Sequence, residues 1–126
     1  MSKAGVADWR ELREFAAVDL TRSFVLSWAF QSDTLLIDVD LYLEPDHAFY
    51  EKPRPAEGVC IRPAVIEFPH CARIGSDGET DANVSGLPPG RIEGLRCVKD
   101  GCYEITGVFG FVRIEAERPI LRLKHA

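Results

Sequence analysis

Hydrophobic and polar residues alternate along two neighbouring stretches of the chain. In the first, residues 23–30, one face carries Phe24, Leu26, Trp28 and Phe30; in the second, residues 34–43, one face carries Leu35, Ile37, Val39, Leu41 and Leu43. A short polar turn, residues 31–33, joins the two stretches. A period of two on both sides of a short turn predicts an antiparallel hairpin with one buried face.

The segment before this hairpin has a different period. Trp9, Leu12 and Phe15 or Ala16 recur at intervals of three to four residues. This spacing predicts a short amphipathic helix over residues 7–17, with Asp8 as a cap or first-turn acid.

Further strands are predicted in the second half of the chain. Residues 59–69 are β-prone, but Pro63 cannot donate a ladder hydrogen bond, so we expect an edge strand or a bulge there. The pair Asp100-Gly101 is typical of a two-residue hairpin turn. Residues 44–58 and 75–90 are rich in proline, glycine and acids and are predicted to be loops.

The predicted elements define a fold class. We count six to eight strands and find no alternation of strands with helices, which excludes a parallel sheet. We therefore expect a mainly β protein: an antiparallel sandwich, roll or partly open barrel with one short N-terminal helix. The length of 126 residues fits a single domain over 1–126.

The composition narrows the location and the partners. No apolar run approaches the roughly 18 residues of a membrane helix, and the first residues contain no apolar signal region. We expect a cytoplasmic protein with reduced thiols and no membrane contact. The net charge of -5 argues against a nucleic-acid partner, which normally meets a basic face.

The negative charge is concentrated in the first half. Residues 1–58 hold 11 acidic and 6 basic residues, whereas residues 59–126 hold 9 of each. An acidic surface beside aromatic anchors suits a basic protein partner. We expect the partner-binding residues to be Asp38, Asp40, Tyr42, Glu44 and Asp46 for charge, and Phe49 and Tyr50 for anchoring.

Other chemistry is weakly indicated. Asp38 and Asp40 share one strand face and could hold a divalent cation, but a hard ion needs about six oxygen ligands, so we interpret them as an outward, solvated face. His47 beside Asp46 lacks a nucleophile. The four cysteines lack the close pairs of a zinc knuckle. A two-residue turn would set Cys97 opposite Glu104, too far from Cys102 for a bridge, whereas a four-residue loop would set the two cysteines opposite each other and permit one. We expect four thiols, no metal site, no cofactor and no catalytic residue.

Three stretches, "DWRELREF" at 8–15, "DLTRSFVLSW" at 19–28 and "YEITGVFGFVRIEAERPIL" at 103–121, give the chain a resemblance to small bacterial β-rich domains of unknown function. That group includes immunity proteins to secreted toxins. The resemblance implies a non-enzymatic protein that binds a partner, and it transfers no functional residues.

We keep three hypotheses. The leading one is a binding module that engages a basic protein partner through an acidic face. The second is a small-molecule-binding or enzymatic β-barrel with a pocket near the 75–90 loop, where His47, His70 and Asp38 would act. The third is a structural subunit of a homo-oligomer, such as a homodimer, that pairs through the edge of residues 59–68.

Overall fold

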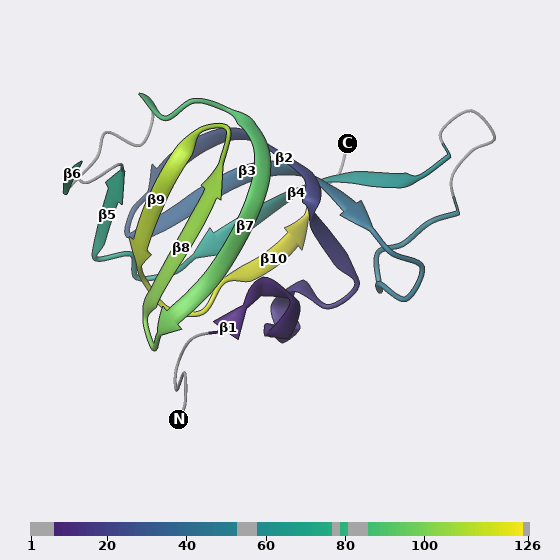
Figure 1. The fold of residues 1–126 in the computed structure, drawn as a ribbon, viewed down its shortest axis with the longest axis horizontal. Coiled ribbons are helices and arrows are strands. Elements are labelled where there is room, and N and C mark those ends of the chain that lie inside the picture. The colour runs from purple at the N-terminus through teal and green to yellow at the C-terminus, as the bar shows by residue number, and fades with distance from the viewer. Residues whose placement is uncertain (1–6, 53–57, 77–78, 81–85, 125–126) are drawn as a thin grey trace.

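The computed structural model describes residues 7–52, 58–76, 79–80 and 86–124, with the side chains of 79–80 excepted. Strands dominate them, and the helical residues lie in short 3-10 turns, of which two are complete within the described chain (Figure 1). The turns are η1 (Trp9–Glu11) and η2 (Arg13–Phe15). The strands are β1 (Ala7–Asp8), β2 (Val18–Gln31), β3 (Thr34–Leu43), β4 (Cys60–Phe68), β5 (Arg73–Ser76), β6 (Glu79–Thr80), β7 (Gly90–Lys99), β8 (Cys102–Gly107), β9 (Gly110–Glu115) and β10 (Ile120–Leu123).

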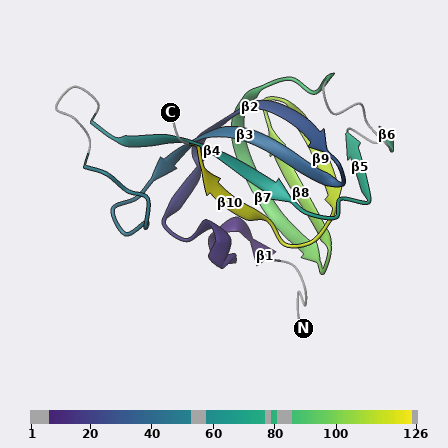
Figure 2. The same ribbon diagram turned by 180° about the vertical axis from the view of Figure 1, so that it is seen from behind.

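All pairings between these strands are antiparallel, and they form one open sheet in the order β10-β4-β3-β2-β7-β8-β9-β5-β6, with β1 added beside β7. The sheet folds over so that β7, β8 and β9 face β2, β3, β4 and β10 as a second layer (Figures 1 and 2). The mainly β, antiparallel class predicted from the sequence is confirmed.

Aromatic pairs join the two layers across the core. Trp28 of β2 meets Phe109, in the β8–β9 turn, edge to face at 5.1 Å between ring centroids. Phe68 of β4 meets Tyr103 of β8 at 5.3 Å. The alternation of β3 is fully confirmed, since Leu35, Ile37, Val39, Leu41 and Leu43 are all buried. Such pairs add to the burial of apolar area that holds the layers together.

The alternation predicted for β2 is wrong over most of its length. Trp28 is buried, but Phe24, Leu26 and Phe30 are 45%, 48% and 44% exposed, and Val25 is buried instead. The register with β3 shifts between Val25 and Ser27. A β-bulge at Leu26 thus reverses the phase of the strand, which a strict period of two cannot anticipate.

The helix predicted over 7–17 forms as two 3-10 turns rather than as an α-helix. Leu12 is extended (φ -90°, ψ 122°) and separates η1 from η2, while Asp8 and Glu11 form a capping box at the start of η1. Trp9, Leu12 and Phe15 are buried at intervals of three, the period at which 3-10 side chains eclipse. Contacts with β7 and β10 place this N-terminal segment against both layers (Figure 1).

The edge strand predicted over 59–69 is only partly correct. β4 pairs with β3 along its whole length, and β10 covers its other side from Ala64 to Glu67. Within the described chain, Cys60–Arg62 and Phe68 pair with no second strand. Pro63 lies just beyond the β10 pairing, where its carbonyl accepts the Lys124 amide at 3.0 Å and no N–H is needed. The interface suggested for a homodimer over 59–68 is therefore occupied by β10 at Ala64–Glu67.

The turn at Asp100-Gly101 is confirmed, because Lys99 pairs with Cys102 directly across it. A second register shift, between Cys97 and Lys99, sets Cys97 opposite Tyr103 instead of the predicted Glu104. The two cysteines consequently point to opposite faces, and all four cysteines are free thiols.

None of the described helical segments is long and apolar enough to cross a membrane. The predicted 75–90 loop contains β5's last residues and β6, and its residues 77–78 and 81–85 lie outside the described part of the chain.

Candidate functional site

An irregular stretch in β2 shapes one end of the molecule. Asp19 pairs with Tyr42 and Phe24 with Asp40, so five steps along β2 match two steps along β3. The stretch is held by Ser23, which is fully buried: its hydroxyl donates to the Asp19 carbonyl at 2.8 Å and accepts from the Tyr42 amide at 3.0 Å. The Ser23 side chain thus replaces the backbone ladder here and satisfies two partly buried backbone groups.

The same stretch presents charge beside Tyr42. The Asp19 carboxylate accepts hydrogen bonds from the amide (3.0 Å) and the hydroxyl (2.6 Å) of Thr21. Arg22 pairs with Asp19 at 3.5 Å, and its guanidinium lies 5.2 Å from the centre of the Tyr42 ring. The Tyr42 ring thus already forms a cation–π contact inside the protein.

A hollow of about 450 Å³ lies between the end of β3, the turn that follows it and the start of β4. Four of the predicted partner-binding residues line it: Tyr42, Glu44, Asp46 and Tyr50. Leu43, Pro45, Gly58, Val59 and Cys60 complete the wall. We call this hollow the acidic pocket, because Glu44 and Asp46 contribute two carboxylates and none of the lining residues that the structure describes is basic.

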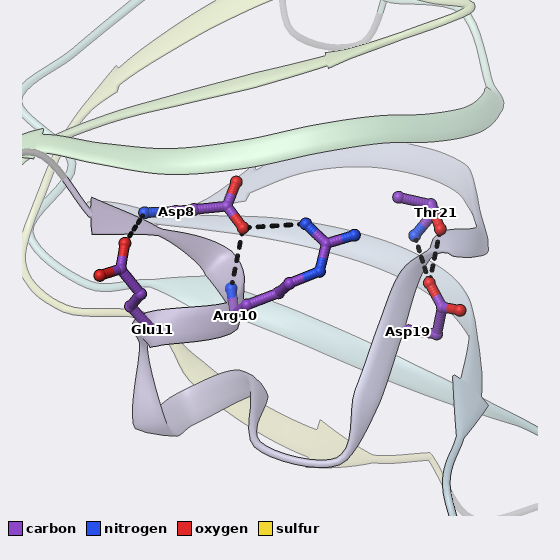
Figure 3. Close-up of polar contacts among 5 residues, drawn as sticks. All are labelled: Asp8, Arg10, Glu11, Asp19 and Thr21. Carbon is purple, nitrogen blue, oxygen red and sulfur yellow. Dashed lines mark hydrogen bonds and ion pairs between the residues drawn. The ribbon is translucent and has the colours of Figure 1, made fainter.

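A second hollow, of about 240 Å³, adjoins the first at Glu44. It is lined by Trp9, Arg10, Phe15, Ala16, Ala17, Val18, Asp19 and Glu44. The Arg10 guanidinium is held by Asp8 at 3.1 Å and extends from η1 toward the bend that contains Asp19 and Thr21 (Figure 3). Its positive charge is therefore already paired, and Glu44 gives both hollows a shared carboxylate.

The remaining predicted residues lie apart from the acidic pocket. Asp38 and Asp40 are on the outer face of β3, in register with Val65 and Pro63 of β4, as the solvated-face interpretation predicts. Asp38 accepts from Ser27 at 3.2 Å and pairs with Lys124 at 3.5 Å.

Phe49 is 36% exposed and packs on the His47 ring at a centroid distance of 5.2 Å, outside the residues that line the hollow. The predicted set therefore divides into a pocket group and an outer-face group.

The two histidines that the structure describes, His47 and His70, make contacts within surface turns. His47 Nδ1 accepts the Phe49 amide at 3.0 Å, and burial lowers the pKa of His47. His70, which has a positive φ of 50°, contacts Asp33 at 2.9 Å and lies 4.0 Å from Glu117. The contacts of His70 thus connect the turns that contain Asp33, His70 and Glu117. Among the described residues no group of three or more His, Cys, Asp and Glu side chains is arranged to hold a metal ion.

Sequence reasoning missed Trp9, Arg10 and Asp19 as neighbours of the acidic pocket. Asp19 comes next to Tyr42 only through the β2–β3 register, and Trp9 through the packing of η1. The local pattern that could have marked Asp19 is "DLT" at 19–21. An Asp side chain often accepts a hydrogen bond from the amide two residues later and so marks a turn, as Asp19 does with the Thr21 amide.

No protein-family model, no curated protein and no solved structure matches the chain.

Proposed function

We propose that the protein is a binding module that engages a basic protein partner through its acidic pocket. The observation that carries the proposal is the convergence of Tyr42, Glu44, Asp46 and Tyr50 around one hollow. These residues come from a strand and from the turn after it, and two carboxylates and two phenol rings meet there with no base among the described lining residues.

The chemistry of the acidic pocket suits a long cationic side chain. Lysine and arginine carry an apolar stem and a charged head, and the pocket has apolar walls at Leu43, Pro45 and Val59 beside its carboxylates. A guanidinium can stack on a tyrosine ring while it donates to a carboxylate. Arg22 on Tyr42 is an intramolecular example of the first of these contacts.

The acids on the outer face of β3 support the same proposal through their longer-range electrostatic attraction. Asp38 and Asp40 add negative charge on the strand that leads to the acidic pocket, and such charge raises the rate of encounter with a basic partner. The partner-binding role implied by the resemblance to immunity-protein-like domains remains a prediction of the same kind.

The test is capture of the partner from host lysate at low and high salt, with three forms of the protein. The first is the unaltered chain, the second is Glu44→Gln/Asp46→Asn, and the third is the control Glu93→Gln/Asp100→Asn, which removes the same charge from exposed positions on and beside β7. We expect one salt-sensitive, stoichiometric partner for the unaltered chain and the control. Loss of two charge-assisted contacts is expected to weaken its binding to the pocket variant about tenfold or more. Equal capture by all three forms would contradict the proposal.

A further inference from the structure

The outer face of the β7–β8–β9 layer carries a charge arrangement that the proposed function does not use. Across three strands, Arg96 of β7, Glu104 of β8 and Arg113 of β9 stand directly side by side in register. Glu104 is 5% exposed, whereas the side chains of Arg96 and Arg113 are 56% and 54% exposed. One buried carboxylate therefore holds two guanidinium groups that remain open to solvent.

The contacts fix the positions of both guanidinium groups. Arg96 donates to Glu104 Oε1 from Nε at 2.9 Å and from the terminal nitrogen at 2.8 Å, and Arg113 donates to Oε2 at 2.7 Å. A guanidinium has five N–H donors, so both groups keep unused donors. Burial of Glu104 opposes its ionisation, but the hydrogen bonds from Arg113 and Arg96 outweigh this and lower its pKa. The carboxylate stays ionised at neutral pH, and the cluster has a net charge of one positive unit.

Nearby acids do not remove this excess. Asp8 lies opposite Arg96 in the β1–β7 register, but its carboxylate is engaged by the amide and guanidinium of Arg10. Glu115 is opposite Arg73 in the next row of the face, where Lys99 adds a further cation. The in-register positions of this face hold four cations, Arg73, Arg96, Lys99 and Arg113, against three acids, Asp8, Glu104 and Glu115, in a chain whose total charge is -5.

The row on the other side of the cluster contains Gly94 of β7, Thr106 of β8 and Phe111 of β9. Thr106 follows Glu104 by two residues on the same face and pairs with Gly94. A Cβ built on Gly94 would meet only the Thr106 hydroxyl oxygen, at 3.7 Å, so little covers this position. The Thr106 hydroxyl makes no side-chain hydrogen bond to another described residue, which leaves it available as a donor.

We propose that Arg96, Arg113 and Thr106 form a binding site for a phosphoryl group, in the space over Gly94 beside the cluster. Two guanidinium groups and a hydroxyl suit an oxyanion that presents several oxygens in different directions. Because Glu104 holds the two arginines before the ligand arrives, little side-chain entropy remains to be lost on binding.

The test is an NMR titration of the whole chain with inorganic phosphate, with a blocked phosphoserine peptide and with acetate, each at constant ionic strength. We expect saturable shifts at Arg96, Thr106 and Arg113 with phosphate, and weaker binding of acetate. Tighter binding of the peptide would identify a phosphorylated protein as the source of the group, and equal or weaker binding would identify free phosphate. Scattered shifts, or equal binding of acetate and phosphate, would overturn the proposal.

Variants separate the site from the stability of the fold. Arg113→Gln is expected to weaken phosphate binding about tenfold or more, since it removes a charged donor. Gly94→Val keeps a strand-compatible backbone, because a Cβ there makes only an ordinary contact, and it should block the row while the protein stays folded. Arg122→Gln, which breaks an exposed pair with Glu67 on the other layer, is the matched control and should bind phosphate normally. Unchanged phosphate affinity in both Arg113→Gln and Gly94→Val would refute the site.

Discussion

Ser23 is the residue on which the geometry of the acidic pocket depends most directly. It is fully buried, and Ser23→Ala would remove the donor to the Asp19 carbonyl and the acceptor of the Tyr42 amide. A buried amide left unsatisfied costs about 1–3 kcal/mol, and the lost bond to the carbonyl adds about 1 kcal/mol. We therefore expect the free energy of unfolding to fall by about 2–4 kcal/mol.

Urea unfolding followed by tryptophan fluorescence measures this change. With a slope of about 2 kcal/mol per molar urea, the midpoint should fall by about 1–2 M. Ser27→Ala is the control, because Ser27 is exposed and bonds only to the partly exposed Asp38, so its effect should stay within about 0.5 kcal/mol. If the two substitutions had equal small effects, the reasoning about the irregular stretch of β2 would be refuted.

Three further predictions concern the phase of β2 and two ionisable groups. Val25→Lys should destabilise the protein by about 3 kcal/mol or more, whereas Leu26→Lys should be nearly neutral, because Val25 is buried and Leu26 is 48% exposed; equal effects would argue against the bulge. Hydrogen bonds from Arg118 lower the pKa of Glu14 below its ordinary value of 4.5, so this carboxylate stabilises the fold above that pH, and the stabilisation is lost as the pH falls through the folded-state value. In acid unfolding, Glu14→Gln should therefore lose less stability than the unaltered chain as the pH falls below 4.5, and parallel curves would contradict this. Burial raises the pKa of Tyr103 to about 12, so the folded protein should show its tyrosinate absorbance only near that pH; since the unfolded value is about 10, its contribution to stability is complete below pH 10 and is lost as the pH rises through 12. Titration of Tyr103 near pH 10 in the folded protein would contradict this assignment.

Periodicity predicted the elements best where burial is uninterrupted. β3 has no register shift toward β4, and each of the five apolar positions on its predicted inner face is buried as the alternation indicates. In β2 the register with β3 shifts twice. The bulge leaves no local signal in residues 23–28, because apolar residues occupy both odd and even positions of this run and fit either face of the strand. The same limit explains why Cys97 faces Tyr103 and not Glu104.

The helical segment shows a different limit. A spacing of three residues at Trp9, Leu12 and Phe15 fits either an α-helix or a 3-10 turn, and a segment of about ten residues has little intrinsic helix stability to decide between them. Tertiary contacts favour the 3-10 form. Arg118 holds η2 through two hydrogen bonds to Glu14, from which it is 104 residues away in sequence. Contacts at such separations are not visible in a single sequence.

The acidic pocket was predictable in part because its residues are close in sequence. Tyr42, Glu44, Asp46 and Tyr50 are close in sequence and meet because a strand ends and a tight turn follows, with the His47 amide donating to the Glu44 carbonyl and the Tyr50 amide to the His47 carbonyl. The Arg96–Glu104–Arg113 cluster depends on the register of three strands, so its members carry no sequence pattern that marks them as neighbours.

The most direct test of the acidic pocket is a titration of the labelled protein with a short blocked peptide that contains one arginine, observed at the resonances of Tyr42 and Tyr50. We expect a saturable shift at both rings in the unaltered chain and in Glu93→Gln/Asp100→Asn, and loss of that shift in Glu44→Gln/Asp46→Asn. If the rings do not respond, or if the pocket variant responds as the unaltered chain does, the acidic pocket does not receive a basic side chain and the proposed function is wrong.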